Sequence, residues 1–363
     1  MTESSSVVKS RKRRGPWITA PFLAALEWIR NPQSRIFALR ILVTLSLLIA
    51  AAICGTINYL TLSGNERQYA ISQYNSITEQ GLVSMVQRFA RMNTGTLVLA
   101  KSYGFAFPDF KEWPNVAVNG FYETVPLLSE VSALDNMYFC PLVLGREQLD
   151  NFTEFAYNYW ASQPNLPPFA GYSLAGRGIW STDPRQTDLS KFFYLDKTGE
   201  VLTYESLYNN GTWFPVFQLT FSEDIGPNNL GLNSHSQEIF GVPGDIQRKC
   251  VNDSASYESA VSDCGSLSNL IPLPIPSPID PFPTLTGLQA FITQPVVLRD
   301  PVDSTQGLFV GTVGGFFNWA TLLSRTVPTY VEGIDCVIST GAVYFTYSIV
   351  EGESIFKGLG DSH

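Results

Sequence analysis

The sequence predicts an α+β protein in which a single N-terminal transmembrane helix is extended by a long helix and followed by an antiparallel-sheet domain. Three observations lead to this prediction. An uncharged apolar run, residues 41–62, is long enough to cross a bilayer as a helix. Apolar residues then recur at helical spacing from Asn65 to about Ala100. Short β-rich segments between turn residues make up much of the remainder.

The apolar run is better explained as a retained anchor than as a cleaved signal peptide, because about forty residues precede it. Eight Lys and Arg residues against Glu3 and Glu27 give this leading segment a net charge of +6. Basic flanks stay in the cytoplasm, so we expect residues 1–38 to form a cytoplasmic tail and residues 39–62 to cross the lipid bilayer. The sequence thus predicts a single-pass membrane protein whose C-terminal part is extracellular or lumenal.

The remainder of the chain is acidic. The whole chain carries −9, so the part beyond the leading segment carries −15. That charge fits a soluble outer domain and argues against a nucleic-acid partner. Three N-x-S/T sequons, at Asn151, Asn210 and Asn252, all fall in this outer part, and we expect glycosylation there.

Four cysteines lie in the outer part, while Cys54 lies in the apolar run. In an oxidising compartment four cysteines allow two disulfides in three pairings. The short spacing between Cys250 and Cys264 favours that pair, which would leave Cys140 to pair with Cys336. Four buried thiols are the alternative.

Residues 63–101 are predicted to form a membrane-proximal helix that continues outward from the bilayer. Its apolar stripe either packs on the following domain or joins two chains in a homodimer through Ile71, Leu82, Met85, Phe89 and Met92. The stripe can also serve both contacts in the same protein. The full stripe reads Ile71, Tyr74, Thr78, Leu82, Met85, Phe89, Met92, Thr96 and Leu99.

The outer domain comprises residues 102–363. Its first half begins with a strand pattern followed by a helix pattern. Residues 136–144 are predicted to form a buried strand and residues 146–161 an amphipathic helix. A D-K-T-G turn within residues 192–206 is typical of a hairpin, and residues 213–221 add a further strand. The apolar face of the predicted helix comprises Leu149, Phe152, Ala156 and Trp160.

The second half contains a proline-rich stretch at residues 269–287, which we expect to be a loop because repeated prolines remove backbone donors. Strands are predicted at 288–298, 307–317, 334–340 and 343–350, with a short helix capped by Asn318 between the second and third of them. The glycines of "GTVGGF" lack the spacing of a nucleotide-binding loop, so we interpret them as packing or bulge positions.

Catalytic patterns are missing from the sequence. Its two histidines are His235, in a predicted polar loop, and His363. Neither a catalytic triad nor a histidine-rich metal site is readily built from them. No phosphate-binding loop, zinc-protease or nucleophile-elbow motif occurs. We therefore expect a non-enzyme without a cofactor or metal.

Aromatic residues are the one indication of ligand binding, since 13% of the chain is aromatic and pockets have apolar walls with few polar groups. A pocket for an unknown small extracellular ligand could use Arg177, Tyr204, Trp213, Phe217 and Gln218. The alternative is ordinary core packing with Arg177 on the surface.

Two C-terminal segments, "GLFVGTVGGFFNWATLLSRTVPTYVEGIDCVIST" and "YFTYSIVEGESIFKGLGDSH", resemble the sensor region of protist receptor-type guanylate or adenylate cyclases. "EWPNVAV" and "WFPVFQ" agree more weakly. The resemblance implies an ectodomain of CHASE, PAS or Cache type. A PAS or Cache domain is also suggested by a long helix, an antiparallel sheet with helices on one face, and a hairpin with a D-x-x-G turn. In that family a second span and a cytoplasmic cyclase domain follow.

This sequence departs from the family because no cyclase domain is present, so no catalytic residue can be carried over. We expect either the N-terminal part of a longer cyclase or a stand-alone sensor that acts through partners. The resulting functional expectation is a membrane-anchored sensor of a signalling receptor in cyclic-nucleotide signalling. A structural or adhesive surface protein is the alternative.

Overall fold

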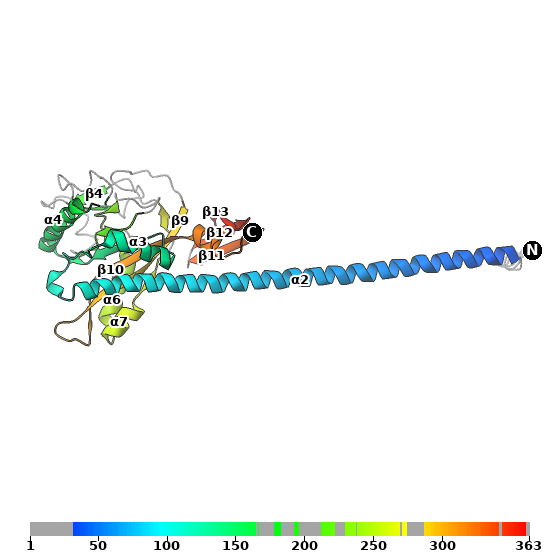
Figure 1. Ribbon diagram of the computed structural model, residues 1–363, viewed down its shortest axis with the longest axis horizontal. Coiled ribbons are helices and arrows are strands. Elements are labelled where there is room, and N and C mark those ends of the chain that lie inside the picture. Colours follow the sequence, from blue (N-terminus) through cyan, green and yellow to red (C-terminus); the bar gives the residue numbers. More distant parts are fainter. Residues whose placement is uncertain are drawn as a thin grey trace, which may run out of the picture. The chain divides into compact units, whose positions relative to one another are not determined.

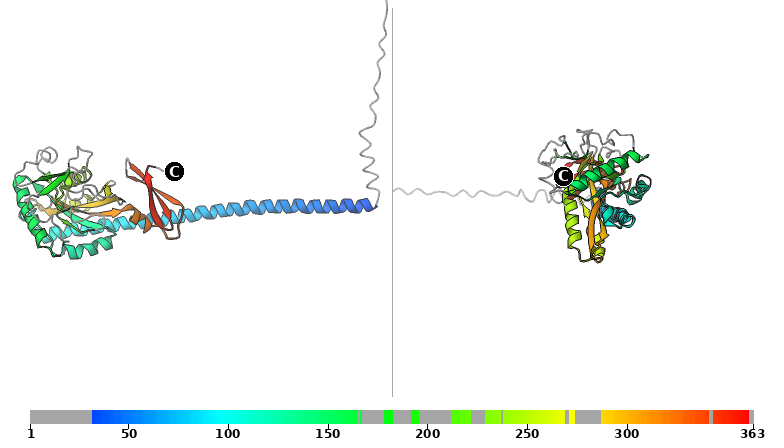
Figure 2. Two further views of the ribbon diagram at one scale, coloured as in Figure 1. Left: turned by 90° about the horizontal axis from the view of Figure 1, so that it is seen from above. Right: turned by 90° about the vertical axis from the view of Figure 1, so that its left-hand side faces the viewer.

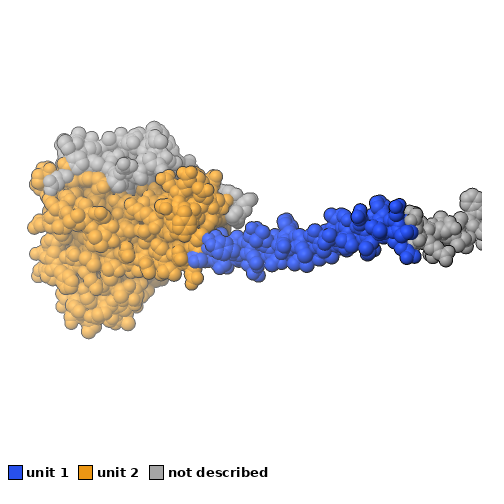
Figure 3. Space-filling view, turned by 45° about the vertical axis from the view of Figure 1, so that its right-hand side comes forward, with its two compact units in different colours: residues 1–76 blue, residues 77–363 orange. Residues whose placement is uncertain are grey.

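The computed structural model describes residues 32–164, 166, 178–182, 192–195, 212–221, 229–236, 238–268, 271–273, 287–340 and 343–360. The chain divides into two compact units, residues 1–76 and 77–363, which Figure 3 distinguishes by colour. As predicted, a long apolar N-terminal helix is followed by antiparallel sheets, so the fold is α+β (Figure 1).

The first unit contains the beginning of helix α2, which runs without interruption from Pro32 to Ala106. In the described part of the chain it is the one helix that is long and apolar enough to cross a membrane, and none of its most apolar window is buried by other parts of the protein. This segment is compatible with a transmembrane or signal-anchor helix. The predicted helix boundary at residue 101 falls five residues short of the observed end.

Within the second unit, the end of α2 packs on the domain that follows it. Met92, Thr96 and Leu99 are buried, and the ring of Phe89 lies edge-on to that of Phe317 at 5.6 Å between centroids. The domain thus covers Met92 fully and Phe89 in part, while Ile71 and Leu82 are exposed, and the pairing of two chains through this stripe stays a prediction. Packing on the following domain, the other expectation from the sequence, holds for this part of the stripe.

The central sheet is antiparallel, with strand order β6-β1-β10-β9-β7, and β8 pairs with a further part of β9. Strands β1 and β10, the first and last of this sheet in the sequence, pair with each other near its centre. The strands are β1 (Asn136–Pro141), β6 (Gln218–Leu219), β7 (Ser266–Leu267), β8 (Ile271–Leu273), β9 (Gly287–Arg299) and β10 (Gly307–Asn318).

Helices cover both faces of this sheet rather than the one face expected from the sequence, as the right-hand view of Figure 2 shows. On one face lie α2 and α3 (Phe121–Ser132), where the ring of Tyr103 stacks on Phe139 at 3.9 Å. On the other lie α6 (Glu238–Asp253) and α7 (Tyr257–Asp263). Helix α4 (Arg146–Ser162) packs beside β6, where the Trp160 indole N–H donates to the Phe217 carbonyl at 2.7 Å.

Smaller elements complete the described structure. The helical ones are η1 (Phe110–Glu112), η4 (Ser234–Ser236) and α8 (Trp319–Ser324). As expected, Asn318 caps α8, because its side-chain oxygen accepts from the Ala320 and Thr321 backbone N–H groups. Three further sheets pair β2 (Val143–Leu144) with β5 (Thr212–Trp213), β3 (Ile179–Thr182) with β4 (Phe192–Leu195), and β11 (Ile334–Thr340) with β12 (Val343–Val350) and β13 (Glu353–Leu359).

Prolines explain two differences from the predicted strands. The strand expected at 213–221 is divided into β5 and β6, because Pro215 has no N–H for a continuous ladder. The proline-rich stretch expected to be a loop contains β8, a short strand with Pro272 that, among the described strands, pairs with β9 alone. The second strand and turn of the hairpin predicted at 192–206 lie outside the described residues, and β4 pairs with β3 instead.

Candidate ligand-binding site

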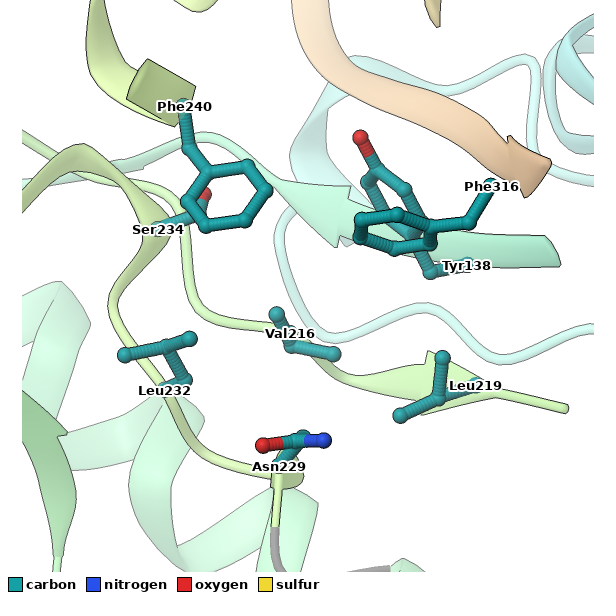
Figure 4. Close-up of a pocket in the computed structure, with 8 residues that line it drawn as sticks. All are labelled: Tyr138, Val216, Leu219, Asn229, Leu232, Ser234, Phe240 and Phe316. Atoms are coloured by element: carbon teal, nitrogen blue, oxygen red, sulfur yellow. The ribbon is translucent and has the colours of Figure 1, made fainter. Parts of the chain in front are cut away.

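A cavity lies on the α6 side of the central sheet (Figure 4). Its free volume is about 20 Å³, which is room for about one water molecule. Side chains from β1, β6, β10, α6, the segment 229–234 and Val216, which lies between β5 and β6, converge on it. The lining residues are Tyr138, Val216, Leu219, Asn229, Leu232, Ser234, Phe240 and Phe316.

The sheet register places Tyr138 in the wall of this cavity. Tyr138 on β1 lies directly opposite Gly314 on β10. A Cβ atom at position 314 would overlap the Tyr138 ring, so glycine is what lets the ring lie across the neighbouring strand. The prediction that the β10 glycines serve packing or a bulge is confirmed, since a register shift also occurs between Phe309 and Gly311.

Aromatic rings close the cavity on the α6 side. Phe240, in the first turn of α6, stacks on Phe291 with 5.0 Å between ring centroids and meets Phe316 edge-on at 6.1 Å. Phe316 in turn lies 5.2 Å from the Tyr138 ring. Burial raises the pKa of the Tyr138 phenol well above its usual value, so this group stays neutral at physiological pH.

Two polar side chains interrupt the apolar wall and differ in their bonding. The Ser234 hydroxyl donates to the Phe214 carbonyl at 2.7 Å. Asn229 is 5% exposed, and its side-chain oxygen is buried without a hydrogen-bond partner among the residues that the structure describes. An unsatisfied buried acceptor costs about 1–3 kcal/mol, so the Asn229 oxygen is the polar group that a bound donor would satisfy.

The residues predicted to bind a ligand do not line this cavity. Trp213 lies in β5 opposite Val143 and is buried. Phe217 is fully buried among the rings of α4, with 5.1 Å between its centroid and that of Tyr159. Arg177 and Tyr204 lie outside the described residues.

Gln218, one of the residues predicted to bind a ligand, is fully buried on the α2 side of the sheet. Its side chain hydrogen-bonds to α2, to the segment around Val118 and to α4. Its side-chain oxygen accepts from the Tyr103 hydroxyl and from the Val118 N–H at 3.1 Å. Its side-chain nitrogen donates to the Val118 carbonyl at 3.2 Å and to the Tyr159 hydroxyl at 2.5 Å. Phe217 and Gln218 therefore serve core packing, the alternative that the sequence left open.

Nothing in the sequence singled out Asn229, Phe240 or Phe316 as site residues, because they come from segments far apart in the chain. The sequence contains a weak signal for the helix at 238–253, because the apolar residues Phe240 and Val251 are separated by about three helical turns. His235, expected in a polar loop, is buried, and its Nε2 lies 3.0 Å from an Asp245 carboxylate oxygen.

The cysteines form one disulfide, between Cys250 and Cys264, whose Cα atoms are 5.6 Å apart. It is the pair that the sequence spacing favours. The expected second pair is wrong, since Cys140 and Cys336 are free. They stand in different sheets, Cys140 in β1 and Cys336 in β11, and burial raises the pKa of both thiols.

Two of the predicted glycosylation sites are on the surface. Asn151 is exposed on α4, and Asn252 is exposed at the end of α6. Asn210 lies outside the described residues. Within the described ranges, His, Cys, Asp and Glu side chains form no group of three or more that could hold a metal ion. A scan of protein-family models and a search of curated proteins each find no match to this chain.

Proposed function

We propose that residues 77–363 form the ligand-binding domain of a membrane-anchored sensor. The cavity beside α6 binds a small, largely apolar molecule that donates a hydrogen bond to Asn229. One observation carries the proposal: Asn229, whose buried carboxamide oxygen has no partner among the described residues, lines a cavity that is otherwise walled mainly by aliphatic and aromatic side chains. Specific pockets combine such walls with a few placed polar groups.

The cavity as it stands holds little more than a water molecule, so a larger ligand requires one wall to move. Phe240 is the side chain best placed to do so. It lies at the start of α6, it is 9% exposed, and it contacts the sheet through Phe291 and Phe316. Rotation of an interface side chain is a common accompaniment of binding.

The proposed location of the domain is outside the cytoplasm. The Cys250–Cys264 disulfide supports an oxidising compartment, and Asn151 and Asn252 are exposed sequon residues. The basic segment before the span supports a cytoplasmic N-terminus. A ligand reaching the cavity would accordingly come from the extracellular or lumenal side.

A PAS- or Cache-type identity is part of the proposal. An antiparallel sheet entered from a long N-terminal helix supports it. The relation to receptor-type nucleotide cyclases rests on the sequence segments around residues 307–340 and 344–363. In such a receptor this chain supplies sensing, and another domain or partner supplies catalysis.

A thermal-shift experiment with matched probes tests the proposal on the full chain in detergent. Indole presents one N–H donor on an apolar ring system, and N-methylindole has nearly the same shape without the donor. We expect indole to raise the unfolding temperature more than N-methylindole does. Binding at ten times Kd adds about 1.4 kcal/mol to the free energy of unfolding.

The variant Asn229→Leu supplies the second arm. It removes the acceptor, so the difference between the two probes should disappear. The free variant should be as stable as the parent protein or more so, because an unsatisfied buried oxygen is replaced by an apolar group. Equal shifts with both probes, or an indole shift that persists in Asn229→Leu, would contradict the assigned site.

A further inference from the structure

A second cavity lies on the α2 side of the central sheet, between α2, α8 and the turn that leads into β1. Phe317 lines it, and strand alternation places Phe317 on the face of β10 opposite to Phe316, which lines the cavity beside α6. Its free volume is about 10 Å³, which is room for one water-sized occupant. The lining residues are Arg88, Met92, Ala133, Asp135, Phe317, Asn318, Thr321, Leu322 and Arg325.

Arg88 of α2 is half-buried in this lining, and its hydrogen bonding is incomplete. Its Nη2 donates at 2.7 Å to the backbone carbonyl of Arg325, the residue after α8, so Arg88 joins α2 to the end of α8. Its Nε–H is buried and has no hydrogen-bond partner among the residues that the structure describes. A buried donor on a charged group is unfavourable without an acceptor, and an occupant of the cavity could supply that acceptor.

Positive charge gathers around Arg88, although the outer part of the chain is acidic. Burial, with the neighbouring charges of Arg325 and Arg91, lowers the pKa of the Arg88 guanidinium below its usual value. None of these three arginines forms an ion pair with a carboxylate in the described part of the chain. Their mutual repulsion is therefore available to attract an anion.

Asp135 is the acidic member of the lining, and its carboxylate has a structural role. Its Oδ2 accepts from the Asn318 backbone N–H at 2.7 Å, at the junction between β10 and α8. One carboxylate beside three guanidinium groups leaves an excess of positive charge. An anion in the cavity would lower that excess, whereas a water molecule would not.

The size of the cavity selects the kind of anion. A space for one water-sized occupant admits a halide ion, but it does not hold the four oxygens of phosphate or sulfate. Chloride is close to water in size and accepts from N–H and O–H donors. The Arg88 Nε–H and the hydroxyl of half-buried Thr321 are donors of these two kinds.

We propose that this cavity is a chloride site, in which Arg88 binds the ion and Arg325 and Arg91 add positive charge. The site is independent of the ligand cavity beside α6, because the two lie on opposite faces of the sheet. A bound chloride completes the hydrogen bonding of the side chain that joins α2 to α8. The chloride concentration then contributes to the stability with which α2 packs on its domain.

Chloride-35 NMR of the full chain in detergent tests the site, because exchange between bound and free chloride broadens the signal. We expect saturable broadening that bromide reverses, and sulfate at equal ionic strength should compete at least about tenfold less well because it does not fit. Thermal unfolding with gluconate replacing chloride at constant ionic strength gives a second readout. Chloride at ten times its Kd should raise the folding equilibrium constant about elevenfold.

Two variants and a control assign the binding to this cavity. Arg88→Gln should weaken chloride binding at least about tenfold, because a charge-assisted donor is lost. Arg325→Gln should weaken it about two- to fivefold, and it keeps the carbonyl that Arg88 bonds, since only an exposed side chain changes. Arg248→Gln on α6 is the matched control, because Arg248 is half-buried like Arg88 but lies across the sheet, and it should bind as the parent does.

Retention of the Cys250–Cys264 disulfide and of protease resistance identifies the folded variants, and Arg325→Gln decides if Arg88→Gln does not fold. Three results would overturn the proposal. The first is the absence of broadening that bromide reverses, which would leave water as the occupant. The second is parent-like binding in folded Arg325→Gln and Arg88→Gln, which would place the chloride elsewhere. The third is displacement by sulfate or phosphate more readily than by bromide, which would indicate an oxyanion site.

Discussion

Gln218 should make a large contribution to the free energy of unfolding of the domain, and the variant Gln218→Leu tests this directly. Leucine has a similar volume and no polar atoms, so packing is largely kept while four hydrogen bonds are lost. Those bonds join β6 to Tyr103 on α2, to both backbone groups of Val118 and to Tyr159 on α4. The variant leaves the partners of Gln218 in place without a donor or an acceptor.

The expected cost follows from the burial of these partners. Tyr103 is fully buried, so its hydroxyl loses its partner without access to water, at about 1–3 kcal/mol. Val118 and Tyr159 are half-buried and can recover part of their bonding from solvent. We expect a total loss of about 2–5 kcal/mol, at about 2–4 °C of unfolding temperature per kcal/mol for a domain of this size.

Gln247→Leu is the matched control, since Gln247 is equally buried and bonds to the hydroxyls of Thr293 and Thr312. These hydroxyls have other acceptors or donors within reach, Ser266 at 2.7 Å and the Gln294 carbonyl at 3.2 Å. The control should therefore lose less stability than Gln218→Leu.

Thermal unfolding followed by tryptophan fluorescence measures the series, with Tyr103→Phe and the double variant completing a cycle. In Tyr103→Phe there is no hydroxyl that could lose its partner. Adding Gln218→Leu should therefore lower the free energy of unfolding by less than it does in the parent protein. Strict additivity of the two changes, or an equal loss in the Gln247→Leu control, would refute the account of Gln218.

Three other predictions concern the disulfide, the buried tyrosines and the glycans. Serine at both Cys250 and Cys264 should lower the free energy of unfolding by about 3 kcal/mol, given their separation of 14 residues; unchanged thermal unfolding would show that the disulfide adds no stability. Burial raises the pKa of Tyr159 and Tyr347 to about 12, above the unfolded value of about 10. Their contribution to stability is thus complete below pH 10 and is lost as the pH rises towards 12, and constant stability over that range by alkaline unfolding would oppose it. Asn151 should carry a glycan in a secretory host, seen as a mass decrease on enzymatic deglycosylation that Asn151→Gln reduces.

Local patterns predicted those elements whose residues carry their own signal. The helix at 146–161 follows from Leu149, Phe152, Ala156 and Trp160, and all four are buried in α4. The Asn318 cap and the long strands β9 and β10 were also visible in the sequence. In each case a period of apolar residues or a capping side chain acts within a few positions, so tertiary contacts were not needed.

Other elements were missed because their patterns compete with unfavourable residues. Helix α6 contains Pro243, Gly241 and Gly244, which weaken a helical reading, and α3 contains Pro126. The cavity was missed for a different reason. Strand alternation sends Gln218 and Leu219 to opposite faces of the sheet, and only knowledge of the register with β1 shows that Leu219 shares a face with Tyr138.

The most direct test of the sensor account is photoaffinity labelling of the full chain with a diazirine derivative of indole, followed by peptide mapping. The account predicts labelled peptides that contain the cavity residues of β6, the segment 229–234 and the first turn of α6, with competition by indole and loss of labelling in Asn229→Leu. Labelling of peptides outside these segments alone, or labelling that indole does not reduce, would contradict it.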